Sequence, residues 1–389
     1  MTLRRRHCLA LLSSAGVPWS ATLAAAQSGG LVGAPPAAQQ RVGAAWRAAD
    51  GSGPFRAGVL RIDWTRSRIE IVHGIELPSR PHGLMAAADG SLLVVAARPG
   101  RWLLRIGADG RIQRELNLDR EGDTATLGGH AIASPDGRLL FTSETDARSG
   151  QGRIGVRDGA TLGKLDEWPS HGREPHQLLL SADGHLMVAN GGIRRGADDR
   201  KADLDAMESS LVRLDARSGA FIGQWRLDDR RLSIRHLAWA AMRDGHAPVL
   251  GLALQAEHDD VHQRRQAPVL ALWDHEQGLQ VPTRAVDAGG YAGDIAAAAD
   301  GAFVISNNRL HRAWLWRPQR AADLTAVARL HEAYALATWG ATPAQGVLVA
   351  AAAGIARWHP TLEPMLVRWP EPMVLDNHWV CLEFPIEAT

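Results

Sequence analysis

The sequence contains few cysteines, almost no lysine and no long hydrophobic run. Only Cys8 and Cys381 are cysteine among 389 residues, and only Lys164 and Lys201 are lysine among 43 basic residues. No stretch reaches the roughly eighteen consecutive apolar residues that a membrane-spanning helix needs, so we expect no membrane span. The formal charge is +1, which gives no reason to expect a nucleic-acid partner.

The composition is that of a folded protein. Hydrophobic residues make up 46% of the chain and charged residues 22%, proportions that argue against intrinsic disorder. The length would accommodate two ordinary domains, but large closed β architectures reach this size as one domain. Length therefore leaves the number of domains open.

The start of the chain has the pattern of an export signal. Three arginines at positions 4–6 precede a short apolar stretch, and Ala24, Ala25 and Ala26 offer a cleavage site. The consecutive arginines resemble a twin-arginine signal, with ordinary secretion as the alternative. Removing this segment leaves Cys381 as the only cysteine, so no intramolecular disulfide can form. We expect a signal peptide at 1–26, a flexible linker at 27–41 and one domain at 42–389, in the periplasm of a Gram-negative bacterium.

One pattern recurs along the chain: a short apolar strand, an Asp-Gly turn and a second apolar strand, as in a β-hairpin. It is complete in PHGLMAAADGSLLVVAA from Pro81, GHAIASPDGRLLFTSE from Gly129, PHQLLLSADGHLMVANGG from Pro175 and GDIAAAADGAFVISNN from Gly293, and degenerate from Arg235 and Ala333. The leading strands follow at intervals of 48, 46, 60, 58 and 40 residues, which suit four-stranded antiparallel blades of a β-propeller. A pair of β-sandwiches gives no reason for such a period.

A seventh blade forms if the two ends of the chain are joined. HWVCLEF from His378 is one leading strand with nothing after it, whereas AAWRAAD, RAGVLRIDW and RIEIVHGIEL near the N-terminus are three strands without a leader. Joining them closes the ring and removes exposed sheet edges. The sequence therefore predicts an all-β, seven-bladed β-propeller closed by pairing the N-terminal strands with the C-terminal strand.

Five leading strands carry a histidine at their start, where the innermost strand of a blade lines the central channel. These residues are His82, His130, His176, His236 and His378, with Asp294 and Tyr334 in the other two blades. Imidazole binds Fe, Cu, Zn or Ni better than Ca or Mg, and the lack of thiolates argues against an iron–sulfur cluster. The five histidines are our candidate metal ligands, most simply for Fe, Cu or Zn; a ring of hydrogen-bonded structural histidines is the alternative.

The second strand of each hairpin returns to the same face and ends in a polar residue. Arg98, Glu144, Asn190, Gln255 and Asn307 form this second candidate ring. They could bind a cofactor, orient the histidines, or hold a ligand carboxylate through Arg98. Hydrogen bonding between blades is the alternative.

Two long insertions open on this face. The segment 193–210 is highly charged and is either a lid or a solvated loop. The segment 257–266 places His258 and His262 four residues apart, a spacing that could hold a metal ion if it is helical. The motifs of serine hydrolases, P-loops and dinucleotide-binding folds are absent from the sequence.

The motifs RPHGL, GGHAIASPDGRLLFTSE, GREPHQLLLSADGHLMVANGGI, MESSLVRLDARSG and DNHW resemble the bacterial family known as domain of unknown function 1513, from about Trp46 onward. The resemblance implies an exported seven-bladed propeller, often with a twin-arginine signal. It also implies a gene neighbourhood with imelysin-like proteins and a dihaem-type oxidoreductase, and thereby periplasmic iron handling. No catalytic residue comes with it.

Three functions are compatible with these observations. The first is a monomeric, non-catalytic accessory that binds a metal or cofactor in iron or metal uptake, with imelysin-like or dihaem oxidoreductase-like partners. The second is a metal-dependent oxidoreductase or hydrolase that uses the same histidines. The third is a protein–protein scaffold whose histidines are structural. Shifted histidine pKa values clustered in a cleft would favour the first two.

Overall fold

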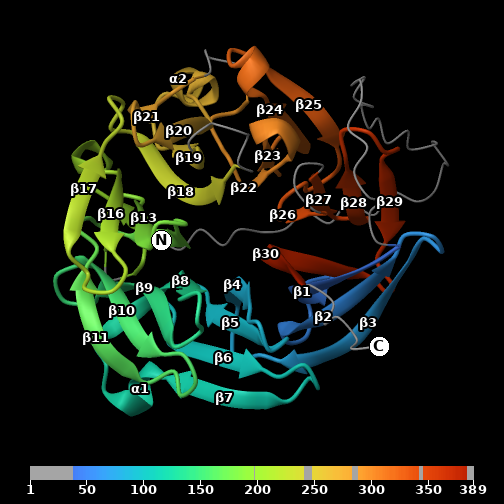
Figure 1. Ribbon diagram of the computed structural model, residues 1–389, viewed down its shortest axis with the longest axis horizontal. Helices are drawn as coiled ribbons and strands as arrows, with labels where there is room; N and C mark the ends of the chain where they lie inside the picture. Colours follow the sequence, from blue (N-terminus) through green and yellow to red (C-terminus); the bar gives the residue numbers. More distant parts are fainter. Residues whose placement is uncertain (1–37, 197, 241–247, 283–287, 341–344, 383–389) are drawn as a thin grey trace, which may run out of the picture.

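The computed structural model describes residues 38–196, 198–240, 248–282, 288–340 and 345–382. In these residues seven four-stranded antiparallel sheets are arranged as blades around a common axis (Figure 1). The predicted all-β, seven-bladed propeller is therefore confirmed. The predicted signal peptide lies outside the described residues, and the first strand begins at Gln39, within the range predicted as linker.

The blades are numbered along the chain, and their strands are given from the axis outward. Blade 2 contains β4 (Pro81–Ala86), β5 (Leu92–Ala96), β6 (Trp102–Ile106) and β7 (Ile112–Asn117). Blade 3 contains β8 (Ala125–Ala133), β9 (Leu139–Asp146), β10 (Gly152–Asp158) and β11 (Lys164–Pro169). Blade 4 contains β12 (Pro175–Leu180), β13 (His185–Asn190), β16 (Ser210–Asp215) and β17 (Phe221–Trp225).

The remaining half of the ring has the same plan. Blade 5 contains β18 (Leu232–Trp239), β19 (Leu250–Ala256), β20 (Leu270–Asp274) and β21 (Gly278–Gln280). Blade 6 contains β22 (Asp294–Ala297), β23 (Phe303–Asn307), β24 (Arg312–Trp316) and β25 (Leu324–Arg329). Blade 7 contains β26 (Leu336–Trp339), β27 (Gly346–Ala351), β28 (Gly354–Trp358) and β29 (Met365–Arg368).

Blade 1 joins the two ends of the chain, as predicted. Its innermost strand is β30 (Met373–Leu382), and outward from it lie β1 (Gln39–Ala48), β2 (Arg56–Asp63) and β3 (Arg68–Glu76). β30 pairs antiparallel with β1, which places the red end of the colour scale beside the blue one (Figure 1). The pairing removes the free edge that β1 would otherwise expose.

Short elements occupy the connections. They are α1 (Leu118–Glu121), α2 (Val261–Gln266), the two-stranded hairpin β14 (Arg194–Arg195) and β15 (Lys201–Ala202), and the 3-10 turns η1 (Leu204–Ala206), η2 (Ala299–Gly301) and η3 (Pro318–Arg320). No helix of the described residues has the length and apolar character to cross a membrane.

The repeated Asp-Gly pairs form the turns that the sequence predicts. In blade 4, Gly184 has φ +84°, a left-handed conformation that glycine adopts without steric cost. The Asp183 carboxylate beside it accepts a hydrogen bond from the Ser181 hydroxyl and lies 2.9 Å from His185 Nδ1. The turn is thus held by side-chain contacts as well as by backbone geometry.

Neighbouring blades pack through apolar side chains that alternate along their strands. Between blades 1 and 7, Trp46, Leu60 and Trp379 pack against Trp339 and other residues of blade 7, and all four are at most 5% exposed. Burial of large aromatic side chains is a major source of stability. The blade interfaces therefore fix the inner strands, and with them the residues at the axis.

Candidate functional site

Histidines from five consecutive blades meet at the axis of the propeller. They lie on the innermost strands of blades 1 to 5, so residues up to about 300 positions apart in sequence become neighbours. The ring, hereafter the histidine ring, consists of His82 on β4, His130 on β8, His176 on β12, His236 on β18 and His378 on β30. The predicted convergence of these histidines is therefore present in the structure.

Each histidine of the ring lies where the ladder of its strand is interrupted. On β8 the paired register breaks between Leu127 and Ala131, on either side of His130. The same break occurs on the other four strands: between Pro81 and Leu84, Pro175 and Leu178, Ile234 and His236, and Leu375 and Trp379. Such irregularities bend a strand and redirect its side chains. All five imidazoles thus lie at or beside an irregularity of the innermost strand.

The imidazoles are packed closely. Ring centroids of His130 and His176 are 4.6 Å apart, as are those of His236 and His378, whereas those of His82 and His236, across the ring, are 6.5 Å apart. His82, His130, His236 and His378 each offer one nitrogen, and these four nitrogens lie within 4.8 Å of one another. The four residues form a group that could hold a metal ion.

Hydrogen bonds within the ring cannot satisfy its nitrogens. His176 Nε2 lies 3.4 Å from His82 Nε2 and 3.1 Å from His236 Nε2. A neutral imidazole nitrogen carries either one hydrogen or one lone pair, so His176 Nε2 can make only one of these contacts as a good hydrogen bond. Buried nitrogens without a hydrogen-bond partner among the described residues are His130 Nε2, His176 Nδ1, His236 Nδ1 and His378 Nε2.

Burial favours the neutral form of four histidines of the ring. Desolvation, followed by the charges of neighbouring histidines, lowers the pKa of His82, His130, His176 and His236 well below the usual value of 6.5. A neutral imidazole has a free lone pair, which is the form that binds metal ions.

Polar side chains contact two histidines of the ring. His378 Nδ1 lies 3.4 Å from Asp294 Oδ2 on β22, which leaves His378 Nε2 for the ring. Asn377 Nδ2 contacts His82 Nδ1 at 3.2 Å. The side-chain oxygen Oδ1 of Asn377 accepts a hydrogen bond from Arg80. A carboxylate behind a histidine is a common means of orienting a metal ligand.

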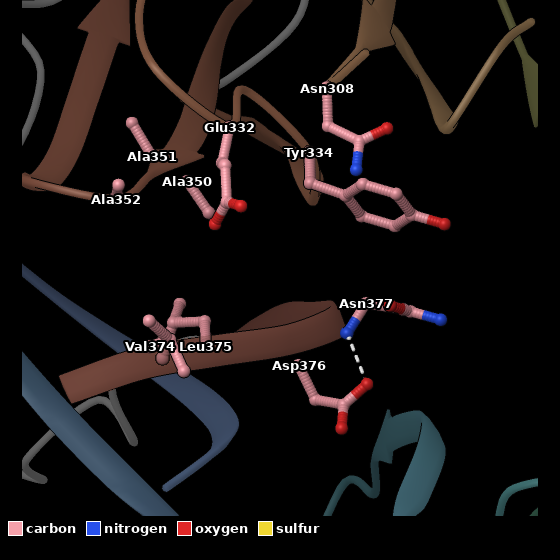
Figure 2. Close-up of a pocket in the computed structure, with 10 residues that line it drawn as sticks. All are labelled: Asn308, Glu332, Tyr334, Ala350, Ala351, Ala352, Val374, Leu375, Asp376 and Asn377. Carbon is pink, nitrogen blue, oxygen red and sulfur yellow. Dashed lines mark hydrogen bonds between the residues drawn. The ribbon is translucent and has the colours of Figure 1, made fainter. Parts of the chain in front are cut away.

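The remaining inner position is occupied by Tyr334, which lies just before β26. Its hydroxyl is 3.2 Å from that of Tyr291. Figure 2 shows Tyr334 and Asn308 on one wall of a cavity of about 140 Å³ and Asp376 and Asn377 of β30 on the opposite wall. The cavity adjoins the ring through Asn377, which contacts His82.

The spacing of the ring nitrogens can be compared with a metal site. Metal–nitrogen bonds of about 2.0–2.1 Å in a tetrahedron separate the nitrogens by about 3.4 Å. The contacts of His176 with its two neighbours already have this separation, whereas the widest pair in the four-histidine group must approach by about 1.4 Å. Within these separations the group of His82, His130, His236 and His378 could hold a metal ion.

Three members of the second predicted ring donate hydrogen bonds to the connections between blades. Asn190 Nδ2 donates to the carbonyl of Ser170, Gln255 Nε2 to that of Ala292, and Asn307 Nδ2 to that of Ala288. These contacts match the alternative of hydrogen bonding between blades. Their role in binding a cofactor stays a prediction.

The other two members are ion-paired. Glu144 is fully buried and pairs with Arg157 at 2.7 Å and Lys164 at 2.9 Å within blade 3. Arg98 pairs with Glu174 at 3.0 Å. The positive charge of Arg98 acts on the histidine ring, because it is one of the causes of the lowered pKa of His82.

The two insertions are placed differently. In the first, β14 and β15 form a hairpin, and Arg195 contacts Glu174 at the rim. In the second, α2 begins only at Val261, so His258 is outside the helix and directs Nε2 to Asp229 at 3.0 Å, while His262 is exposed. The helical pairing of His258 and His262 is therefore not formed.

Glu174, Arg195 and Arg235 are residues that the sequence did not single out. Arg235 immediately precedes a ring histidine, and Glu174 stands two positions before another. Glu174 has φ +54°, a conformation that non-glycine residues rarely adopt. The closeness of Glu174 and Arg235 to two ring histidines in the sequence was the available signal. The ion-pair partners of Glu174, however, include residues of other blades.

Comparison with known proteins identifies a family and a shared fold. Residues 75–382 match the family model described as "Protein of unknown function (DUF1513)". No curated protein matches the chain. The hydrazine synthase of Kuenenia stuttgartiensis is 14% identical with a TM-score of 0.55, and the match covers 83% of this chain and 94% of that one.

Two further solved structures resemble the chain. The virginiamycin B lyase of Staphylococcus aureus is 13% identical with a TM-score of 0.50, over 75% of this chain and 85% of that one. The WD40 repeats of RRP9 are 12% identical with a TM-score of 0.55, over 79% and 85%. At these identities the likeness concerns the fold alone, and proteins with different functions share it.

Proposed function

We propose, from the premise that the chain belongs to the DUF1513 family of proteins of unknown function, that it is a non-catalytic binding protein for a transition-metal ion or a metal-containing cofactor. The histidine ring is the binding site. His82, His130, His236 and His378 supply the ligands, and His176 lies within reach of two of them. Iron, copper and zinc suit such a set of imidazoles.

The observation that carries the proposal is the group of unpartnered, buried nitrogens in the ring. Leaving a buried polar atom without a partner costs about 1–3 kcal/mol, and four such atoms occur here. A cation bound by lone pairs would satisfy several of them together. The lowered histidine pKa values clustered in the ring favour a binding site over a purely structural one.

The number of ligands favours binding over catalysis. Catalytic zinc sites have three protein ligands and leave one position for water or substrate, whereas closed sites have four. Four histidines are grouped here, and His176 is a fifth within contact distance. A metal held in this way has no position reserved for a substrate.

The role in iron or metal uptake, in the periplasm, rests on the signal-like start of the sequence and on the family resemblance. Imelysin-like and dihaem oxidoreductase-like proteins are the proposed partners, and the protein acts as an accessory that holds the metal for them.

Elemental analysis of protein purified from its own host, without chelators or a nickel-binding tag, tests the proposal. We expect about one equivalent of Fe, Cu or Zn in the native protein and its loss in His130→Ala and His378→Ala. The matched control is His262→Ala, which changes an exposed histidine on α2 and should retain the metal. A native protein that is metal-free and takes up none of these ions on titration would refute the proposal.

A further inference from the structure

A second feature of the rim is a cavity of about 730 Å³. It is lined by residues of blades 2, 3 and 4, and the hairpin β14–β15 contributes to its lining. Its lining includes five arginines, and we call it the arginine pocket: Arg98, Arg148, Arg173, Arg194 and Arg195. The volume is within the range of sites for small molecules.

Arginines converge on one buried carboxylate at the base of this pocket. Glu174 Oε1 lies 2.6 Å from Arg195 Nη2 and 3.0 Å from Arg98 Nη1, and Glu174 Oε2 lies 3.1 Å from Arg235 Nη2. Glu174 and Arg235 are 4% exposed. Asp199 is the next acidic group, 3.6 Å from both Arg98 and Arg195. The lining as a whole has five arginines and four carboxylates, those of Asp146, Glu174, Asp199 and Asp203, so it carries one excess positive charge.

Burial and these neighbouring charges act together on the pKa values of the individual groups. Burial lowers the pKa of Arg98 to about 10, with a further contribution from repulsion by Arg235 and Arg195. The attraction of Glu174 acts in the opposite direction but is smaller than the effect of burial. Burial would raise the pKa of Glu174, but the three arginines hold it at about 2. Arg98 Nε is buried and has no hydrogen-bond partner in the described part of the chain.

A purely structural clamp on Glu174 does not explain the whole set. Arg148, Arg173 and Arg194 also face the pocket but form no ion pair with Glu174 among the described residues. Arg194 is 44% exposed, and its closest acidic partner is Asp203 at 3.7 Å. Arg173 Nη1 donates to the carbonyls of Ser149 and Gly150. Guanidinium groups gathered around a cavity are suited to carboxylate or phosphate oxygens.

We propose that the arginine pocket binds a small multivalent anion that carries carboxylate or phosphate groups. The site goes beyond the proposed metal function and does not require it, because none of its lining residues belongs to the histidine ring. It nevertheless adjoins the ring, since Glu174 stands two residues before His176 and Arg98 acts on the pKa of His82.

Calorimetric titration of the mature, metal-free protein with citrate and, separately, with pyrophosphate tests this proposal. We expect binding of at least one of them, with an affinity that falls as salt concentration rises. Citrate binding alone would assign a carboxylate ligand, and pyrophosphate binding alone a phosphate ligand. Acetate serves as the monovalent probe and should bind at least tenfold more weakly.

Two variants locate the site. Arg194→Gln removes a guanidinium that is not bound to Glu174 and should weaken binding by about tenfold or more, because bonds between charged groups are the stronger ones. Arg195→Gln should weaken it by a smaller factor, because Arg195 is already paired with Glu174. Arg56→Gln is the matched control: Arg56 is 47% exposed and paired with Glu76 on the outer strands of blade 1, so its loss should leave the affinity unchanged. Thermal unfolding confirms that each variant is folded; if Arg195→Gln is not, Arg194→Gln decides.

The outcomes separate this proposal from the metal site. Anion binding that persists in His130→Ala supports the arginine pocket even if the native protein carries no metal. No binding of either anion at 10 mM, or binding that Arg194→Gln and Arg195→Gln leave unchanged, would overturn it whatever the metal content.

Discussion

Buried polar residues near the rim are of two kinds: some have a polar partner within the protein, and others have a polar atom without one. Glu144 and Arg157 are both fully buried, and each has the other as a partner at 2.7 Å. His130 and His378 are buried too, but each has a nitrogen without a partner among the described residues. A paired group is explained by the fold alone, whereas an unpaired one requires a further explanation, such as a bound water or ion.

Replacing Glu144 should therefore affect stability. Glu144→Gln leaves the buried Arg157 guanidinium with only the more distant Asp123 carboxylate, at 3.9 Å, which should cost about 3 kcal/mol in the free energy of unfolding. Urea unfolding measures the loss. Glu76→Gln, at an exposed ion pair with Arg56, should change stability by less than about 1 kcal/mol. Equal effects of the two variants would contradict the buried pairing.

The Asp-Gly turn of blade 4 should show a defined pH dependence. Burial raises the pKa of Asp183, but hydrogen bonds with Ser181 and His185 and the charge of Arg213 outweigh burial. Together they lower this pKa from 3.8 to about 2. A lowered carboxyl pKa contributes stability that is present above 3.8 and lost as the pH falls towards 2. Asp183 is 57% exposed, so we expect Asp183→Asn to cost about 1 kcal/mol or less at pH 6. Thermal unfolding should show a much smaller difference from the native protein at pH 2, where Asp183 is about half protonated; a constant difference would contradict the shift.

Among the elements, the inner strands could be predicted from the sequence and their irregularities could not. The repeated Asp-Gly turns and the period near fifty residues reveal hairpins such as β4–β5 and β12–β13, because these signals are local. The breaks in register beside His82 and His176 depend on how each strand meets its neighbour. The sequence thus predicts that the histidines lie at the axis, but not how closely their rings pack.

The closing strand β30 should be essential for stability. Trp379 on β30 is 5% exposed in the core between blades 1 and 7, so Trp379→Ala should cost about 3–5 kcal/mol in the free energy of unfolding. Phe221→Ala, on the outermost strand of blade 4 where Phe221 is 51% exposed, should cost less than about 0.5 kcal/mol. Urea unfolding compares them. A small effect of Trp379→Ala would mean that the ring does not depend on this closure.

For the whole molecule, the limit of sequence-based prediction is the assembly of sites from several blades. The seven-bladed ring was predicted because each blade repeats the same pattern. The cluster of Glu174 with Arg98, Arg195 and Arg235 combines three blades, and no local pattern relates these positions. In the second predicted ring, Asn190 and Asn307 bond to connections between blades, which is the alternative that the sequence leaves open; their role in binding a cofactor stays a prediction. Position along a strand does not determine which way a side chain points.

Metal binding at the axis should stabilise the whole ring, because it links inner strands of four blades. An ion present at a hundred times its dissociation constant adds about 2.7 kcal/mol to the free energy of unfolding. Thermal unfolding should therefore occur several degrees higher with Zn²⁺ than after removal of metal. The increase should vanish in His378→Ala and persist in His262→Ala; an equal increase in both variants would place the ion elsewhere.

The central claim is that the histidine ring holds a metal ion, and anomalous X-ray diffraction at the absorption edge of the bound metal measures this most directly. The predicted result is one anomalous peak on the axis, about 2.0–2.2 Å from imidazole nitrogens of His82, His130, His236 and His378. A ring whose nitrogens are bridged by water in protein soaked with Fe, Cu or Zn, with the peak absent or elsewhere, would contradict it and leave the histidines as structural residues.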